Sequence, residues 1–199
     1  MTTTIDFRIL NREPLLDYKQ ACKITKGEKL HLAFMKKPKD EVEYWVSAIL
    51  ANHSTLRAVR FRMTAKAPKS VIMQLIRATK GHPQPYVQSS RPDWTGKERS
   101  ADPYEEKLFI HDHTAESFVQ MASQRLCMKT EKMTREFAEK ARLTLIARKE
   151  PFLRAVGLCC LPPCAVSSLC PELTSCGRFP RVKDAVYEAY RTAYIESEG

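Results

Sequence analysis

This chain lacks any long hydrophobic run: no apolar stretch in its 199 residues reaches the ~18 residues that a membrane-spanning helix needs. Its first ten residues, MTTTIDFRIL, also lack the basic start and apolar stretch of a secretory signal peptide. It contains no internal repeat and no block of consecutive like charges. These absences argue against a membrane protein, a collagen, a coiled-coil rod and a secreted mini-scaffold. With 43% hydrophobic and 28% charged residues, we expect one globular, cytoplasmic domain spanning residues 1–199.

Positive charge is in excess, with 33 Lys and Arg against 23 Asp and Glu and a formal net charge of +10. Such an excess favours anionic partners, among them nucleotides, phosphorylated cofactors, nucleic acid and acidic lipid. A solvated basic surface is the plainer alternative. The basic residues are spread along the chain, which fits phosphate pockets inside a fold better than a disordered nucleic-acid arm.

The hydrophobic pattern predicts an α+β fold, with a small, mostly antiparallel sheet packed by several helices. Strands are expected at 4–10 and around 56–63, and residues 31–35 fit a short strand or a loop. Helices are expected at 12–24, 40–50, 68–79, from 114 onward, at 129–149 and at 181–196. Residues 80–104 read as a long functional loop with a short extended piece, and 159–180 as irregular structure.

The most informative stretch runs from residue 68 to residue 94. Gln74 and Arg77 are three apart on one expected helix, so both side chains leave the same face. Ser89 and Arg91 are two apart and share a face if extended. Guanidinium groups suit phosphate because they donate two parallel hydrogen bonds, and an amide suits the edge of a pyrimidine. The alternative is a surface helix with ordinary solvated arginines.

These residues resemble the flavin-dependent thymidylate synthases. In that family a helix with Gln-x-x-Arg precedes a loop that closes with Ser-x-Arg, here Gln74 to Arg77 and Ser89-Ser90-Arg91. The resemblance covers roughly residues 45 to 180. Three further blocks carry it: LANHST at 50–55 followed by Phe61, the pair Arg125 and Arg135 in RLCMKTEKMTR, and LPPCAVSSLCPELTSCG at 161–177. The order of these blocks is more specific than any one of them.

The resemblance implies reductive methylation of dUMP, with methylenetetrahydrofolate and NADPH as co-substrates and FAD as cofactor, in a homotetramer with sites between subunits. It implies flavin contacts from His53, Thr55, Arg77 and Arg125, nucleotide contacts from Gln74, Arg77, Ser89, Ser90, Arg91 and Arg135, and catalytic roles for Arg91 and Arg135. Three anionic ligands in one site would also account for the positive net charge.

The sequence departs from the family pattern at its hallmark. The family's Arg-His-Arg is Arg77-Ala78-Thr79 here, Tyr86 stands where an Asn is usual, and Glu131 replaces a Gln. These departures leave open the hypothesis that the protein is a relative that transfers a methyl or hydroxymethyl group to carbon 5 of another pyrimidine nucleotide. A catalytically inactive nucleotide- or nucleic-acid-binding homologue and a regulatory subunit also stay open. No aromatic-rich stacking strand or known nucleic-acid-binding motif favours nucleic acid.

Five of the seven cysteines lie between residues 159 and 176. Cys164, Cys170 and Cys176 recur every six residues, and Cys127 is placed on a helix that could approach them, so a structural zinc site is one hypothesis. Reduced, partly buried thiols are the other. Cys159 and Cys160 are expected in the core. His111 and His113 are two residues apart, a spacing that could bind a metal ion. The alternative is that they lie at an exposed junction between a strand and a helix.

Overall fold

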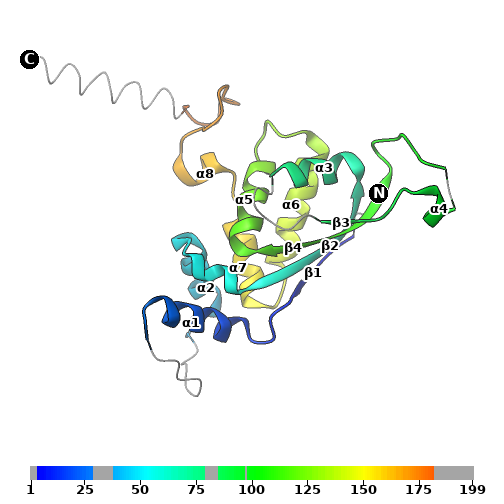
Figure 1. Ribbon diagram of the computed structural model, residues 1–199. Helices are drawn as coiled ribbons and strands as arrows, with labels where there is room; N and C mark the ends of the chain where they lie inside the picture. Colours follow the sequence, from blue (N-terminus) through cyan, green and yellow to red (C-terminus); the bar gives the residue numbers. More distant parts are fainter. Residues whose placement is uncertain (1–3, 29–37, 79–84, 97, 182–199) are drawn as a thin grey trace, which may run out of the picture.

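The computed structural model describes residues 4–28, 38–78, 85–96 and 98–181, which form an α+β fold around a four-stranded antiparallel sheet (Figure 1). The strands are β1 (Ile5–Ile9), β2 (Arg60–Pro68), β3 (Tyr86–Val87) and β4 (Glu106–Thr114), in the order β1-β2-β4-β3. The helices are α1 (Pro14–Thr25), α2 (Glu41–Ala51), the 3-10 helix η1 (Ser54–Ala58), α3 (Lys69–Ala78), α4 (Pro92–Thr95), α5 (Ala115–Arg125), α6 (Lys132–Ile146), α7 (Pro151–Cys159) and α8 (Pro163–Ser167). The expected α+β class with a small antiparallel sheet is confirmed.

Side chains alternate strictly along the two central strands. Phe61, Met63 and Ala65 of β2 point toward the helices and are buried, while their neighbours in the strand point to the opposite face. On that opposite face Arg62 donates two hydrogen bonds, of 2.7 and 2.9 Å, to the carboxylate of Asp112, its partner across the β2–β4 ladder. The register of the sheet is therefore fixed by burial on one face and by charge pairing on the other.

An aromatic cluster joins the sheet to the helices. Phe61 of β2 contacts Phe118 of α5 and Phe152 of α7, with ring centroids 5.5 and 5.9 Å apart. Phe152 in turn meets Trp45 of α2 nearly edge-on, at 4.9 Å. All four rings are almost fully buried, and edge-to-face contacts of this kind add to the stability that burial of the rings already gives.

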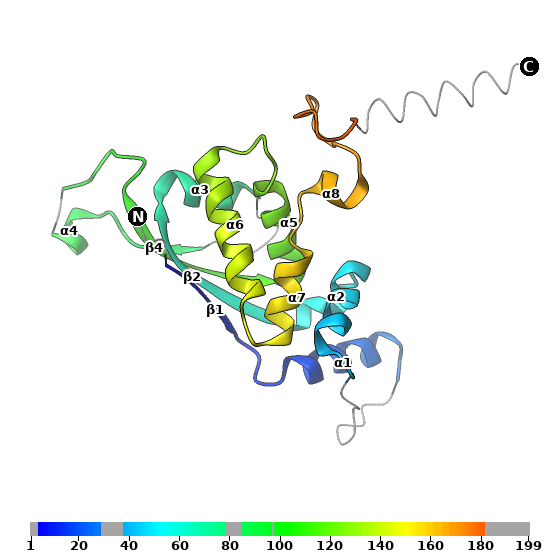
Figure 2. The ribbon, with the colours of Figure 1, turned by 180° about the vertical axis from the view of Figure 1, so that it is seen from behind.

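Helices α6 and α7 lie side by side, and Gly157 of α7 lets the two backbones approach closely (Figure 2). A Cβ placed on Gly157 would lie 2.8 Å from the Leu145 Cβ and 2.9 Å from the Ile146 backbone nitrogen. Gly157 is therefore required by packing, because any side chain would push α7 away from α6.

Local signals set the helix starts. The Asp40 carboxylate accepts hydrogen bonds from the first turn of α2, and Thr114 and Ser117 form a reciprocal capping box at the start of α5. Glu131 caps α6 by accepting from the backbone of Met133 and Thr134, and these hydrogen bonds lower the pKa of its carboxyl.

Some expectations were wrong in detail. Leu56 belongs to η1 and not to a strand, and Pro68 ends β2, so that α3 starts one residue later. His111 and His113 were expected to be exposed at a junction between a strand and a helix, and this was wrong. Both are 1% exposed, because they lie on the buried face of β4 beside Met63 and Phe61. The short helices α4 and α8 were not predicted. Residues 31–35 and all but the first residue of 181–196 lie outside the described part of the chain.

Candidate functional site

A cavity of about 680 Å³ lies where three segments of the chain meet. One wall is the turn that joins α5 to α6, with Arg125, Cys127 and Lys129. The opposite wall is formed by the start of α8 and by the loop that follows it, and Gln74 of α3 completes the lining. The cavity is thus built from the parts of the sequence in which three of the resemblance's blocks lie.

Arg125 lines this cavity, and Arg77, from a different helix, lies near Arg125 without lining the cavity itself. Arg125 is the last residue of α5, and its Nε is buried without a hydrogen-bond partner among the described residues. Burial, and then the positive charge of Arg77 on α3, lower the pKa of Arg125. Neither arginine forms an ion pair with a described carboxylate. Two like charges, one of them partly buried, attract an anion because a bound anion removes their repulsion.

The amphipathic pattern of α3 aims Gln74 at the cavity. Val71, Ile72 and Leu75 are buried on the inner face of the helix, whereas Gln74 is half-buried and Arg77 exposed. The prediction that Gln74 and Arg77 are on the polar side of one helix is therefore confirmed. Ala78, where the family has histidine, is 2% exposed and packs into the core.

Arg135 holds the wall of the cavity and does not line it. Its Nη1 donates to the carbonyl oxygens of Met128 and Thr130, at 3.1 and 3.4 Å, in the turn before α6. These bonds fix the backbone that carries Cys127 and Lys129. In the isolated chain, Arg135 thus positions the cavity wall.

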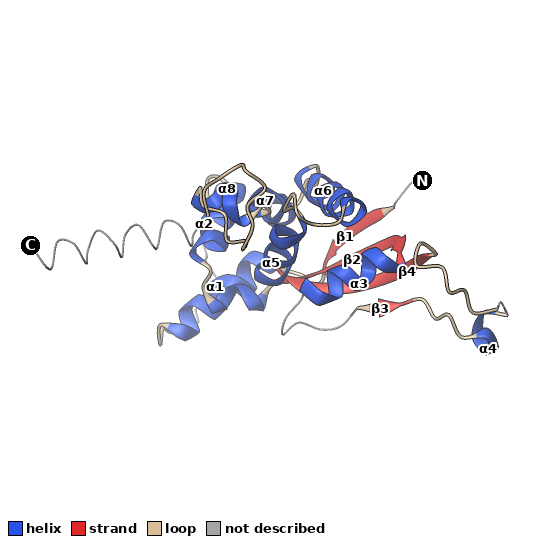
Figure 3. Cartoon of the chain, turned by 90° about the horizontal axis from the view of Figure 1, so that it is seen from above, coloured by secondary structure: helices blue, strands red, loops and turns tan. Residues whose placement is uncertain are grey.

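Ser89, Ser90 and Arg91 lie on a separate part of the molecule. They belong to an arm, residues 88–96 and 98–105, that extends past the end of the sheet and carries α4 (Figures 1 and 3). Arg91 pairs with Asp93 at 2.6 Å, and its guanidinium lies 4.7 Å from the ring centroid of Trp94. Ser89 and Ser90 line a second cavity of about 610 Å³, which shares no lining residue with the first.

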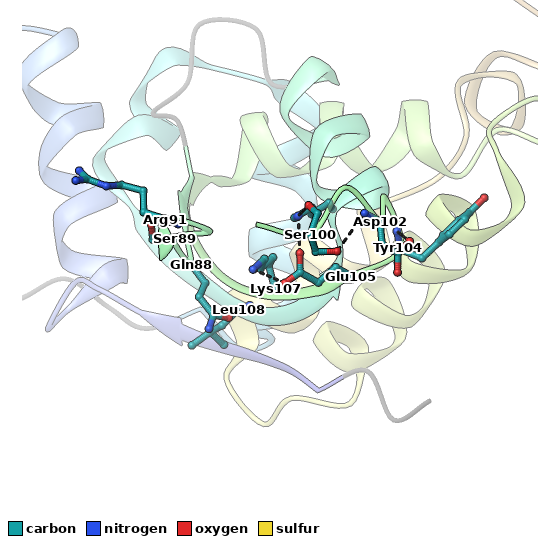
Figure 4. Close-up of polar contacts among 10 residues, drawn as sticks. Gln88, Ser89, Arg91, Ser100, Asp102, Tyr104, Glu105, Lys107 and Leu108 are labelled. Atoms are coloured by element: carbon teal, nitrogen blue, oxygen red, sulfur yellow. Dashed lines mark hydrogen bonds and ion pairs between the residues drawn. The ribbon is translucent and has the colours of Figure 1, made fainter. Parts of the chain in front are cut away.

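The second cavity contains a charged cluster that sequence reasoning missed. Lys107 is 6% exposed, and its Nζ lies 2.6 Å from one carboxylate oxygen of Glu105, while Lys69 contacts the other. Hydrogen bonds from Lys107 and then Lys69 lower the pKa of Glu105. Figure 4 shows Arg91 directed away from this cluster. The available signal was the alternation along β4, which places Lys107 on the buried face with Phe109.

His53 and Thr55 lie at the start of η1, away from the arginine pair. Arg57 of η1 pairs with Glu116 in the first turn of α5, at 2.9 Å, whereas Arg125 ends that helix. Nine residues of α-helix span about 14 Å, so the described chain does not bring η1 to the arginines. His53 is exposed, and the Thr55 hydroxyl accepts a hydrogen bond from the Cys22 thiol at 3.5 Å.

Four of the seven cysteines line the first cavity: Cys127, Cys164, Cys170 and Cys176. These are the four residues of the zinc hypothesis. Among the described residues, no three His, Cys, Asp or Glu side chains are grouped so that they could hold a metal ion. All seven thiols are free, and Cys159 and Cys160 are buried, as expected.

Within the described ranges, no helix combines the length and the apolar character needed to cross a bilayer. No protein-family model matches this chain, and a comparison with curated proteins finds no matching relative.

Proposed function

We propose that this protein is a flavin-dependent thymidylate synthase that methylates dUMP. The observation that carries the proposal is the pair Arg77 and Arg125, which lie near one another beside Gln74 and form no ion pair with a described carboxylate. A buried, unpartnered guanidinium Nε costs free energy unless a ligand accepts its hydrogen bond. A phosphate group is a suitable acceptor, and both ligands of the proposed reaction, dUMP and FAD, carry one.

The residues of this chain bind and orient the ligands in that proposal. Arg77 and Arg125 hold phosphate, and Gln74 offers one donor and one acceptor to a pyrimidine edge. Arg91 favours negative charge that develops on the uracil ring, and Arg135 holds the turn that forms one wall of the cavity. When bound, FAD carries hydride from NADPH to the one-carbon unit supplied by methylenetetrahydrofolate.

A second copy of the chain is required by the proposal. Ser89, Ser90 and Arg91 lie on the arm, in a different cavity from Gln74 and Arg125, and His53 and Thr55 lie near the far end of α5. Because the arm extends away from its own helices, we propose that it reaches the arginine cavity of a neighbour in a homotetramer. The complete site is then shared between subunits.

The test is the visible absorption spectrum of the purified protein, titrated with FAD and then with dUMP. We expect the flavin bands to shift on binding and to shift again when dUMP is added. Arg125→Met should weaken flavin binding by about tenfold or more, since a hydrogen bond to a charged group is lost. Arg154→Met, on the exposed face of α7, is the matched control and should bind normally.

One observation supports a second candidate, a homologue that binds a pyrimidine nucleotide without flavin. Ala78 replaces the family's histidine and is buried in the core, so no imidazole reaches a ligand from this position. This candidate predicts that dUMP raises the melting temperature while FAD leaves the spectrum unchanged at every concentration. That pair of results would contradict the synthase proposal and favour the second candidate.

A further inference from the structure

The thiols of the arginine cavity differ from those of the core. Cys159 and Cys160 are buried among apolar side chains, and burial raises the pKa of Cys159 to about 11, which keeps it protonated and unreactive. Of the four thiols around the cavity, Cys164 and Cys170 are nearly covered, whereas Cys127 is half-buried and Cys176 is exposed. The two accessible thiols therefore lie on opposite walls of the same cavity.

Cationic side chains outnumber carboxylates around this cavity. Arg125, Lys129 and Arg178 line it together with two carboxylates, Glu131 and Glu172. The Glu131 carboxylate is engaged at the start of α6, and the charge of Arg77 is added to those of the three lining cations.

The segment that carries Cys176 closes on itself at its base. We call residues 170–181 the thiol loop. The Cys170 backbone nitrogen donates to the Pro180 carbonyl at 2.7 Å, and Arg181 Nη1 donates to the Leu173 carbonyl at 3.2 Å. Between these bonds the loop contributes no buried residue, and Leu173 is 87% exposed. The loop can therefore move across the cavity without disturbing the core.

We propose that Cys127 and Cys176 form a peroxide-sensitive thiol pair, whose disulfide fastens the thiol loop across the cavity mouth. Hydrogen peroxide transfers one oxygen atom to the Cys176 thiolate, which gives a sulfenic acid and releases hydroxide. The Cys127 thiolate then attacks that sulfur, forms the S–S bond and releases a second hydroxide. With the two thiol protons, both hydroxides become water, so two thiols and one peroxide yield one disulfide and two waters.

The bond requires the Cα atoms of Cys127 and Cys176 to lie within about 7 Å of one another. The thiol loop would then be held against the turn between α5 and α6, beside Arg125 and Lys129. For its effect on ligand binding this inference rests on the function proposed above, because oxidation then restricts entry to the anion site. Formation of the bond itself is independent of that function.

The experiment treats the full-length protein with hydrogen peroxide and maps disulfides by non-reducing proteolysis and mass spectrometry. We expect a loss of two hydrogen atoms per chain, one linked peptide pair that joins Cys127 to Cys176, and reversal by a thiol reductant. Cys127→Ser and Cys176→Ser should each abolish the link, whereas Cys22→Ser, a half-buried thiol outside the cavity, should leave it intact. A link between any other pair, irreversible oxidation alone or no reaction overturns the proposal.

A second measurement separates this inference from the proposed function. Binding of dUMP is measured on the reduced and the oxidised protein by the shift in melting temperature. Weaker binding after oxidation supports both proposals. If the disulfide forms but neither state binds dUMP or FAD, the proposed function fails and the thiol pair stands. If the reduced protein binds dUMP and peroxide leaves the thiols free, the function stands and the thiol pair is wrong.

Discussion

Arg125 lies close enough to Arg77, on a different helix, for the positive charge of Arg77 to lower its pKa. Neither side chain forms an ion pair with a described carboxylate, so no such pair relieves this repulsion directly. Such an arrangement contributes nothing to folding and is consistent with a binding role. Its effect on stability can be measured without knowing the ligand.

Replacing Arg125 with Met should leave the ligand-free protein as stable as before or more stable, by about 0.5 kcal/mol, because a like-charge contact and a desolvated charge are removed. The measurement is urea unfolding at low and high salt, and salt should reduce the gain by screening the repulsion in the original protein. Arg154→Met is the control and should show no such gain. A clear loss of stability in Arg125→Met would show that the guanidinium is structural.

The shared site predicts complementation between two inactive variants. Arg91→Ala removes the arm's contribution, and Arg125→Met removes the cavity's contribution, so each alone should lack nucleotide binding. Unfolded together and refolded as a mixture, the two should regain part of the binding, because some assembled sites then receive an intact arm and an intact cavity. Refolding of each variant by itself is the control. No recovery in the mixture would place both arginines in the same chain's site.

Asp112 should make the free energy of unfolding fall at acid pH. Hydrogen bonds from Arg62 lower the pKa of Asp112, so its carboxylate stabilises the folded state above the unfolded value of about 3.9. That contribution is lost as the pH falls through the lower folded value. Asp112→Asn should therefore cost about 1 kcal/mol at pH 7 and less at pH 3, measured by urea unfolding. Asp93→Asn, in an exposed pair on the arm, should change little at either pH.

Gly157→Ala should be among the most damaging single-methyl changes in the chain. The added Cβ meets the Leu145 Cβ and two backbone atoms of α6 at 2.8 to 3.0 Å, so we expect a loss of about 2–3 kcal/mol. Gly27→Ala is the comparison, since Gly27 has φ +70° and open space around it. There only the backbone conformation opposes a side chain, and the loss should be about 1 kcal/mol. The measurement is thermal unfolding of both variants. Equal losses of stability in the two would contradict the close packing at Gly157.

Helices with a clear apolar stripe were predictable, and so was the face of α3 that carries Gln74 and Arg77. Burial at regular spacing fixes such elements locally. The position of the arm was not predictable, because it depends on β3 pairing with β4 across a loop and not on its own residues. Likewise, the six-residue spacing of Cys164, Cys170 and Cys176 does not indicate that all three line one cavity together with the turn between α5 and α6. Convergence of segments is a tertiary property that a periodic pattern does not contain.

The thiol loop also indicates where the chain tolerates added length. Its base is closed by the Cys170–Pro180 hydrogen bond, and Leu173 projects into solvent. Lengthening a loop that is already closed costs little free energy, since the entropy of closure rises only slowly with length. A short reporter peptide inserted beside Leu173 would therefore be carried at the rim of the arginine cavity, where a fluorophore on it could follow ligand arrival from outside the site.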